Sequence, residues 1–211
     1  CLLFPLTGIA QKKQLQTVRD QIKSGKELTK AENTLRGLLV DSVSKKNNKI
    51  WLLLCDALIK QYEQGNEKLY LKQKYDTAAF FSVTRRLYDT MSRFDSLDAK
   101  PDAEGRVRAK YRTKHAEFLN SIRPNLFNGG SYFIHKKDYN TAFDYYSDYL
   151  ESANYPLFEG YDYMKNDALI PHAAYWAMFC GYKLSDADKI MRFKEQAERD
   201  TSMLNFVRQY E

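Results

Sequence analysis

The sequence is poor in residues that interrupt helices, with 9 glycines and 5 prolines among 211 residues. Straight-chain helix formers are plentiful, and no segment keeps the apolar–polar alternation of a half-buried strand. Cysteine is also scarce, at 3 residues, which excludes a disulfide-rich scaffold. No apolar run approaches the roughly 20 residues that a membrane-spanning helix needs. These absences favour an all-α protein without a transmembrane span.

Motifs for catalysis and metal binding are missing as well. The 3 histidines, His115, His135 and His172, have no second ligand at the spacing of a zinc site. The sequence contains no Gly-rich phosphate loop and no nucleophile elbow. Cys55 and Cys180 lie on apolar stripes, where a thiol packs as a free core residue. We therefore expect no enzyme activity, no cofactor and no metal.

The formal net charge of +6 is modest, and lysine and arginine are interspersed with acidic residues. Such a distribution is typical of a solvated surface. Basic residues alternate between Arg106 and Lys114, in a segment expected to be helical from Glu104 to Asn120. This stripe could hold an anion, but export from the cell, inferred below, makes nucleic acid an unsuitable partner.

The first ten residues, Cys1 to Ala10, are apolar and uncharged, and a polar chain begins at Gln11. Gly8 and Ala10 are small residues two apart, as a signal peptidase site requires. Residues 1–10 are therefore interpreted as the end of a signal peptide, and residues 11–211 as an exported domain. A buried apolar segment and a lipid anchor on Cys1 are the alternatives.

The apolar residues of most segments recur with the period of an amphipathic helix. Residues 65–74 and 153–167 break this pattern and are interpreted as insertions. The pattern predicts helices, in antiparallel pairs, at residues 15–25, 28–39, 50–63, 75–94, 104–120, 125–136, 139–152, 170–183, 186–199 and 203–210.

One phrase recurs at the start of the second helix of a pair. Tyr75 is followed three residues later by Ala78, and Tyr139 is followed by Ala142 in the same way. Weaker copies lead to Ala31 and Ala187. A bulky residue can fill the hairpin turn, while alanine lets two helix backbones approach closely. The recurrence predicts repeated helix hairpins.

These residues resemble the tetratricopeptide repeat, a 34-residue helix-turn-helix. Trp51-x2-Leu54-Cys55-x2-Leu58 is similar to its first helix. The fullest copy is Leu126-x2-Gly129-Gly130-x2-Phe133, followed by Tyr139 and Ala142-x3-Tyr146, with the two glycines expected at a close helix crossing. A signal-peptide end followed by divergent repeats rich in Tyr and Lys resembles exported repeat proteins of Bacteroidetes-type bacteria, which implies a location in the bacterial periplasm or cell envelope. Irregular spacing between the copies leaves an irregular helical bundle as the alternative.

The resemblance implies a right-handed α-solenoid of stacked antiparallel hairpins, of which this chain could be the first part. It implies a non-enzymatic scaffold that binds a protein or peptide in a groove lined by the first helix of each pair. The groove residues that the resemblance implies are Leu52, Asp56, Ile59 and Lys60 in one hairpin and Phe127, Ser131, Ile134 and His135 in another.

The most aromatic loop runs from Tyr155 to Tyr163. Its rings either fold back onto the helices or present an adhesive surface to a peptide or sugar. The second possibility supports an alternative function, in which residues 65–74 and 153–167 carry a carbohydrate-binding, polymer-binding or enzymatic site.

Overall fold

The computed structural model describes the backbone of residues 4–209, and within that range every regular element is a helix. The all-α prediction is confirmed. The chain divides into two compact units, the first ending at Tyr111 and the second beginning at Arg112. Cys1, and with it the proposed lipid anchor, lies outside the described residues. None of the described helices has the length and hydropathy that crossing a bilayer requires.

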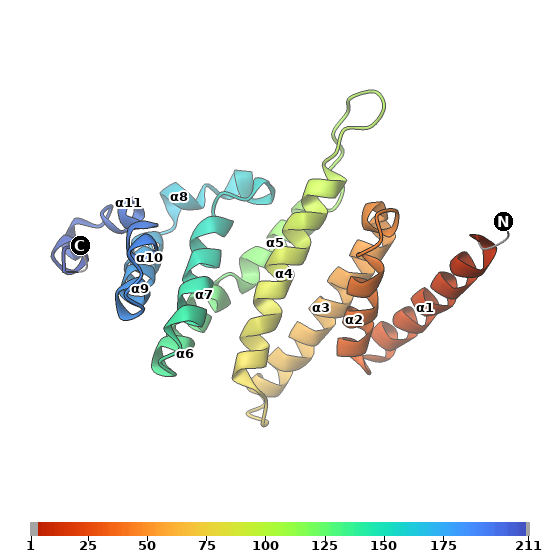
Figure 1. Ribbon diagram of the computed structural model, residues 1–211, viewed down its shortest axis with the longest axis horizontal. Helices are drawn as coiled ribbons and strands as arrows, with labels where there is room; N and C mark the ends of the chain where they lie inside the picture. Colours follow the sequence, from red (N-terminus) through yellow and green to blue (C-terminus); the bar gives the residue numbers. More distant parts are fainter. Residues whose placement is uncertain (1–3, 210–211) are drawn as a thin grey trace. The chain divides into compact units, whose positions relative to one another are not determined.

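The first unit is built from four long helices and one short 3-10 helix (Figure 1). α1 packs on α2 and α3, α2 packs on α3, and α3 packs on α4. The bounds are α1 Phe4–Ser24, α2 Leu28–Leu38, η1 Ser44–Lys46, α3 Asn48–Tyr70 and α4 Thr77–Asp98.

The second unit contains a hairpin whose two helices match the predicted 125–136 and 139–152 to within one residue at all four ends. α7 packs on both α6 and α9, and α9 packs on α10 and α11. The bounds are α5 Arg112–Ile122, α6 Pro124–His135, α7 Tyr139–Ser152, η2 Pro156–Tyr161, α8 Tyr163–Asn166, α9 Ile170–Lys183, α10 Ala187–Met191, α11 Lys194–Ala197, η3 Thr201–Met203 and α12 Leu204–Val207.

Side-chain caps explain where several helices begin. The Asp76 carboxylate accepts hydrogen bonds from the backbone N–H groups of Ala78 and Ala79, at 2.9 and 3.2 Å. Asp138 caps α7 by accepting from Thr141 N at 3.1 Å, and Asp186 caps α10 in the same way. These bonds satisfy amide groups that have no partner within the helix.

The tyrosine of the repeated sequence occupies a different position at the start of α4 than at the start of α7. Tyr75 precedes α4 and its ring lies against Gly65, where an added Cβ would be 2.8 Å from the ring. Tyr139, by contrast, is the first residue of α7. Of the four alanines, Ala31 and Ala142 are fully buried, whereas Ala187 is exposed. Alanine is therefore buried in only part of the predicted set.

The predicted break at Gly65–Asn66 is wrong, because α3 continues to Tyr70. Gly65 is needed for its small size beside Tyr75 and does not end the helix. The insertion predicted at 65–74 is therefore reduced to the connection between α3 and α4, from Leu71 to Asp76. The 153–167 segment is irregular as predicted, with the short helices η2 and α8.

The helix predicted at 104–120 is wrong in its first half, since α5 begins only at Arg112. Figure 1 shows the preceding residues as a loop that extends beyond the end of α4. The Asp102 carboxylate accepts hydrogen bonds from the backbone N–H groups of Glu104 and Arg106, and Gly105 has a φ of 78°. This local turn competes with helix formation.

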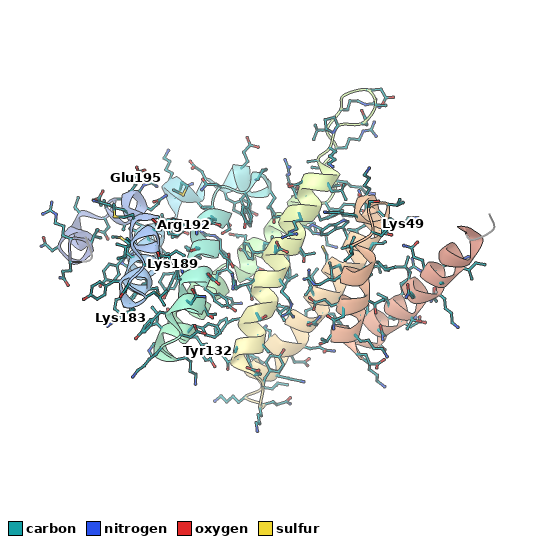
Figure 2. All side chains as sticks on the ribbon, in the orientation of Figure 1. Lys49, Tyr132, Lys183, Lys189, Arg192 and Glu195 are labelled. Atoms are coloured by element: carbon teal, nitrogen blue, oxygen red, sulfur yellow. The ribbon has the colours of Figure 1, made fainter. Side chains whose placement is uncertain are left out.

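The helix predicted at 186–199 is interrupted between α10 and α11. Phe193 stands at the break with a φ of −122°, is buried, and packs near the ring of Phe143. The neighbouring cations hold α10 against α7 (Figure 2): Lys189 donates to Asn140 at 3.3 Å and Arg192 pairs with Glu151. The break in the helix between α10 and α11 therefore coincides with the burial of the Phe193 ring.

Candidate functional site

The segment between α7 and α9 folds back onto the second unit. Leu157, Phe158 and Tyr163 are buried, with 4%, 1% and 9% of their surfaces exposed. Tyr161 remains half-exposed, and its ring stacks on that of Tyr163 with centroids 5.4 Å apart. Of the two possibilities left open by the sequence, folding back holds for the buried rings, while Tyr161 is partly exposed.

Arg123, at the junction of α5 and α6, lies at the centre of this region. Its guanidinium carbon is 3.8 Å from the ring centroid of Tyr149 and 4.0 Å from that of Tyr163. The residue is only 4% exposed, and its Nη2 donates to the Tyr149 carbonyl at 3.0 Å. Arginine tolerates such burial because its weakly hydrated guanidinium stacks on aromatic faces.

Asp167 neutralises Arg123 through an ion pair and also accepts a hydrogen bond from the Tyr149 hydroxyl at 2.6 Å. Burial raises the pKa of Asp167, but the hydrogen bonds from Tyr149 and Arg123 outweigh it, so the net pKa is lowered. Burial also raises the pKa of Tyr163, to about 12. At neutral pH the cluster therefore holds one cation, one anion and neutral tyrosines.

An open cavity of about 370 Å³ adjoins this cluster and is called here the tyrosine–arginine pocket. Its size lies at the lower end of the range for small-ligand sites. The half-exposed Tyr161 ring lines it, with one side packed against Tyr163. The amides of Asn120 and Asn166 also line it: the Asn120 oxygen accepts from the Tyr163 hydroxyl, and the Asn166 Nδ2 donates to the Tyr161 carbonyl at 3.2 Å. The lining residues are Asn120, Arg123, Pro124, Tyr149, Tyr161, Tyr163, Asn166, Asp167 and Leu169.

The titratable groups of this pocket are engaged with one another. The Asp167 carboxylate is committed to Arg123 and Tyr149, and its lowered pKa makes it a weak base at neutral pH. Tyr149, whose pKa burial raises, is a poor proton donor. A planar or ring-shaped ligand can instead stack on Tyr161 and hydrogen-bond at the rim.

The groove residues predicted on α3 lie on one side of that helix, outside its buried core. Leu52 and Ile59 are half-buried, and Asp56 is exposed. The Lys60 side chain is 44% exposed and pairs with Glu63 at 3.5 Å. The buried positions of α3 occupy the opposite side, at Ile50, Trp51, Leu54, Cys55, Ala57, Leu58 and Gly65.

The residues predicted on α6 occupy the same helical offsets, but two of them already contact α7. Phe127 packs edge-on against the rings of Tyr146 and Tyr149, and the Ser131 hydroxyl is 3.0 Å from the Tyr146 hydroxyl. Ile134 is half-buried and His135 is exposed. The His135 Nδ1 lies 2.7 Å from the Ser131 carbonyl, to which it donates. The four α6 residues therefore do not form a continuous free face.

The other candidate chemistry has a structural explanation. Cys55 and Cys180 are buried free thiols, and burial raises both pKa values, that of Cys180 to about 12. The basic stripe is wrong as a helical feature: Arg106 lies in a loop, where it pairs with Asp102 and Glu104. Among the described residues, no cluster of three or more His, Cys, Asp or Glu side chains could hold a metal ion.

The Arg123–Asp167 pair was not anticipated from the sequence. Pro124 occupies the first turn of α6, where its fixed φ and missing N–H are tolerated. The only signal in the sequence was the aromatic loop up to Tyr163.

Comparisons with protein-family models, with curated proteins and with solved structures found no match.

Proposed function

We propose that this chain is a non-enzymatic interaction scaffold of the bacterial cell envelope that binds a peptide or protein partner along the first helices of its hairpins. The face of α3 formed by Leu52, Asp56, Ile59 and Lys60 is the observation that carries the proposal. This α3 face combines half-buried apolar side chains with an exposed acid and a partly exposed base. A peptide can bury apolar side chains against such a surface and form charged contacts at its edges.

The packing within each unit supports the same proposal. In the first unit the helices contact one another in chain order, and α1 reaches α3 as well as α2. In the second unit α7 lies between α6 and α9. We propose that the hairpins within each unit stack as in a tetratricopeptide-like α-solenoid, in which neighbouring first helices together form a binding surface.

A peptide-display selection against the full chain tests this proposal directly. The selected peptides are synthesised, and their affinities are measured for the native chain and for the double variant Asp56→Ala, Lys60→Ala. Because charged contacts at the edge of an interface contribute little individually, we expect the double variant to bind about tenfold more weakly.

The matched control is Asp20→Ala, Lys23→Ala, which removes one acid and one base from exposed positions of α1 in the same unit. This control leaves the net charge unchanged, as the α3 variant does, and should retain native affinity. Selected peptides that bind both variants as tightly as the native chain would show that the α3 face is not the binding surface.

A carbohydrate-binding function is the second candidate, and the half-exposed Tyr161 in the tyrosine–arginine pocket favours it. Aromatic rings bind the apolar faces of sugars, while amides such as that of Asn166 can bind hydroxyl groups. A panel of oligosaccharides measured against the native chain and Tyr161→Ala tests this candidate. Saturable binding that the substitution abolishes would support it, and absence of binding to the whole panel would remove it.

A further inference from the structure

A second cavity, in the first unit, has lining residues of one charge sign. It measures about 570 Å³ and lies between the η1 region, the start of α3 and the end of α4. No acidic residue is among its lining residues, all of which belong to the described chain. We call it the Trp51 cavity; its lining residues are Ser42, Lys45, Lys46, Trp51, Arg93, Ser96, Leu97 and Lys100.

Trp51 and Leu97 give this cavity an apolar surface. Trp51 is 8% exposed, and its indole N–H donates to the Lys45 carbonyl at 2.9 Å. That hydrogen bond fixes the ring and satisfies its only donor, so the indole offers a ligand an apolar surface rather than a polar group. Leu97 is half-buried beside it.

The cations belong to two separate chain segments. Lys45 and Lys46 end the 3-10 helix η1, while Arg93 and Lys100 belong to α4 and the residues just after it. Arg93 is paired with Asp89 at 2.7 Å, and the three lysines are exposed. α4 ends at Asp98, and extending its axis two residues further puts positions 93 and 100 roughly 10 Å apart.

This spacing selects the kind of ligand. A compact anion such as phosphate could contact Arg93 or Lys100 but would be too small to contact both. None of the four cations is buried enough to hold such an anion in a closed site. An extended peptide advances about 3.3 Å per residue, so two acidic residues a few positions apart can reach both ends. An apolar residue between them would lie against Trp51 and Leu97.

We propose that the Trp51 cavity binds an acidic peptide segment, with carboxylates at both ends of the cavity and an apolar side chain on the indole. The site is distinct from the α3 face, so it extends the proposed function and does not depend on it. Positive potential in the cavity would also steer an acidic partner toward it, and added salt would weaken the interaction.

Trp51 itself provides the readout. The chain contains 2 tryptophans, so Trp176→Phe leaves Trp51 as the only one, and excitation at the long-wavelength edge avoids the tyrosines. In this background we titrate a blocked peptide of sequence Asp-Glu-Leu-Asp-Glu and follow Trp51 emission. Saturable change is expected, whereas the uncharged isostere Asn-Gln-Leu-Asn-Gln and inorganic phosphate should produce none at the same concentrations.

Lys45→Gln with Lys46→Gln is expected to weaken binding about tenfold, since exposed charge pairs each contribute a few-fold. Lys26→Gln with Lys74→Gln, two exposed lysines of the same unit outside the cavity, is the matched control and should bind as the background does. Circular dichroism confirms that the variants fold.

Three results would overturn the proposal. The first is an absence of saturable change with the acidic peptide, and the second is equal weakening by both double variants, which would indicate only long-range charge attraction. The third is an equal response to phosphate alone, which would indicate a site for free anions. The double variant Asp56→Ala, Lys60→Ala should lose the display-selected peptides and still bind the acidic peptide. That result would show that the α3 face and the Trp51 cavity are separate binding surfaces.

Discussion

Gly130 on α6 lies directly against the ring of Tyr146 on α7, so closely that a Cβ on Gly130 would stand 2.6 Å from two ring carbons. Gly129 has the same relation to Tyr145. Both tyrosines are almost fully buried, at 1% or less exposure. The glycine pair is therefore where two large rings enter the contact between two helices, and the lack of side chains at 129 and 130 makes room for them.

Gly130→Ala should destabilise the second unit. Alanine would gain about 1 kcal/mol in helix propensity, but overpacking a filled interface typically costs about 1–3 kcal/mol. We expect a net loss of about 1 kcal/mol in the free energy of unfolding, measured by urea unfolding of the full chain. Gly37→Ala is the control, since Gly37 is an exposed helical residue with nothing within 4 Å of an added Cβ. That variant should be slightly more stable, and equal loss in both would contradict the packing argument.

The parts of the fold that follow from local rules could be predicted from the sequence. The α6–α7 hairpin was located closely because its apolar period is regular and Asp138 provides a cap. The same reasoning failed at Gly65, because a glycine in a helical pattern usually indicates a helix end. At this position the small size of glycine is required by the contact with the Tyr75 ring. Tyr75 lies on the next helix connection, so its packing against Gly65 is not visible in the pattern of α3 alone.

The tyrosine–arginine pocket could not be predicted for a similar reason. Arg123 and Asp167 are far apart in sequence and belong to segments that gave no common signal. Their pairing depends on how the segment after α7 folds back, which is set by burial of Phe158 and Tyr163. The turn at Asp102 is local, and its hydrogen bonds to Glu104 and Arg106 prevail over the helical pattern of residues 104–111.

The interpretation of residues 1–10 as the end of a signal peptide leads to a prediction about the mature chain. Protein isolated from its native envelope should begin at Gln11, as determined by N-terminal mass spectrometry. Removing Ile9 and Ala10 takes no buried side chain from α1. Ala10→Arg should block processing, because the cleavage site requires a small residue. An acylated N-terminus at Cys1 would instead establish the lipid anchor.

Cys55 and Cys180 should react with thiol reagents only when the chain opens. Both thiols are buried and have raised pKa values, so little thiolate is present at neutral pH. In a Cys1→Ser background, we expect modification of the native protein to be at least about 100-fold slower than in denaturant, since access requires local opening. Rapid labelling of either residue in the native protein would show that its surroundings open readily.

The Arg123–Asp167 pair should make the stability of the second unit sensitive to acid. The pKa of Asp167 is lower in the folded state than in the unfolded state. The ionised carboxylate therefore contributes fully to the free energy of unfolding above the ordinary aspartate pKa of about 4, and this contribution is lost as the pH falls through the lower folded-state pKa. Stability measured by urea unfolding should therefore fall below about pH 4. Asp167→Asn should remove this part of the pH dependence.

At neutral pH, Asp167→Asn should also lower the free energy of unfolding by about 3 kcal/mol, because it leaves Arg123 buried without its counter-charge. Asp162→Asn is the control, since this exposed carboxylate belongs to the same segment and does not line the tyrosine–arginine pocket. The control should alter neither the neutral-pH stability nor its acid dependence by a comparable amount. If both variants retain native stability, stacking on Tyr149 and Tyr163 alone is sufficient to hold the Arg123 cation in place.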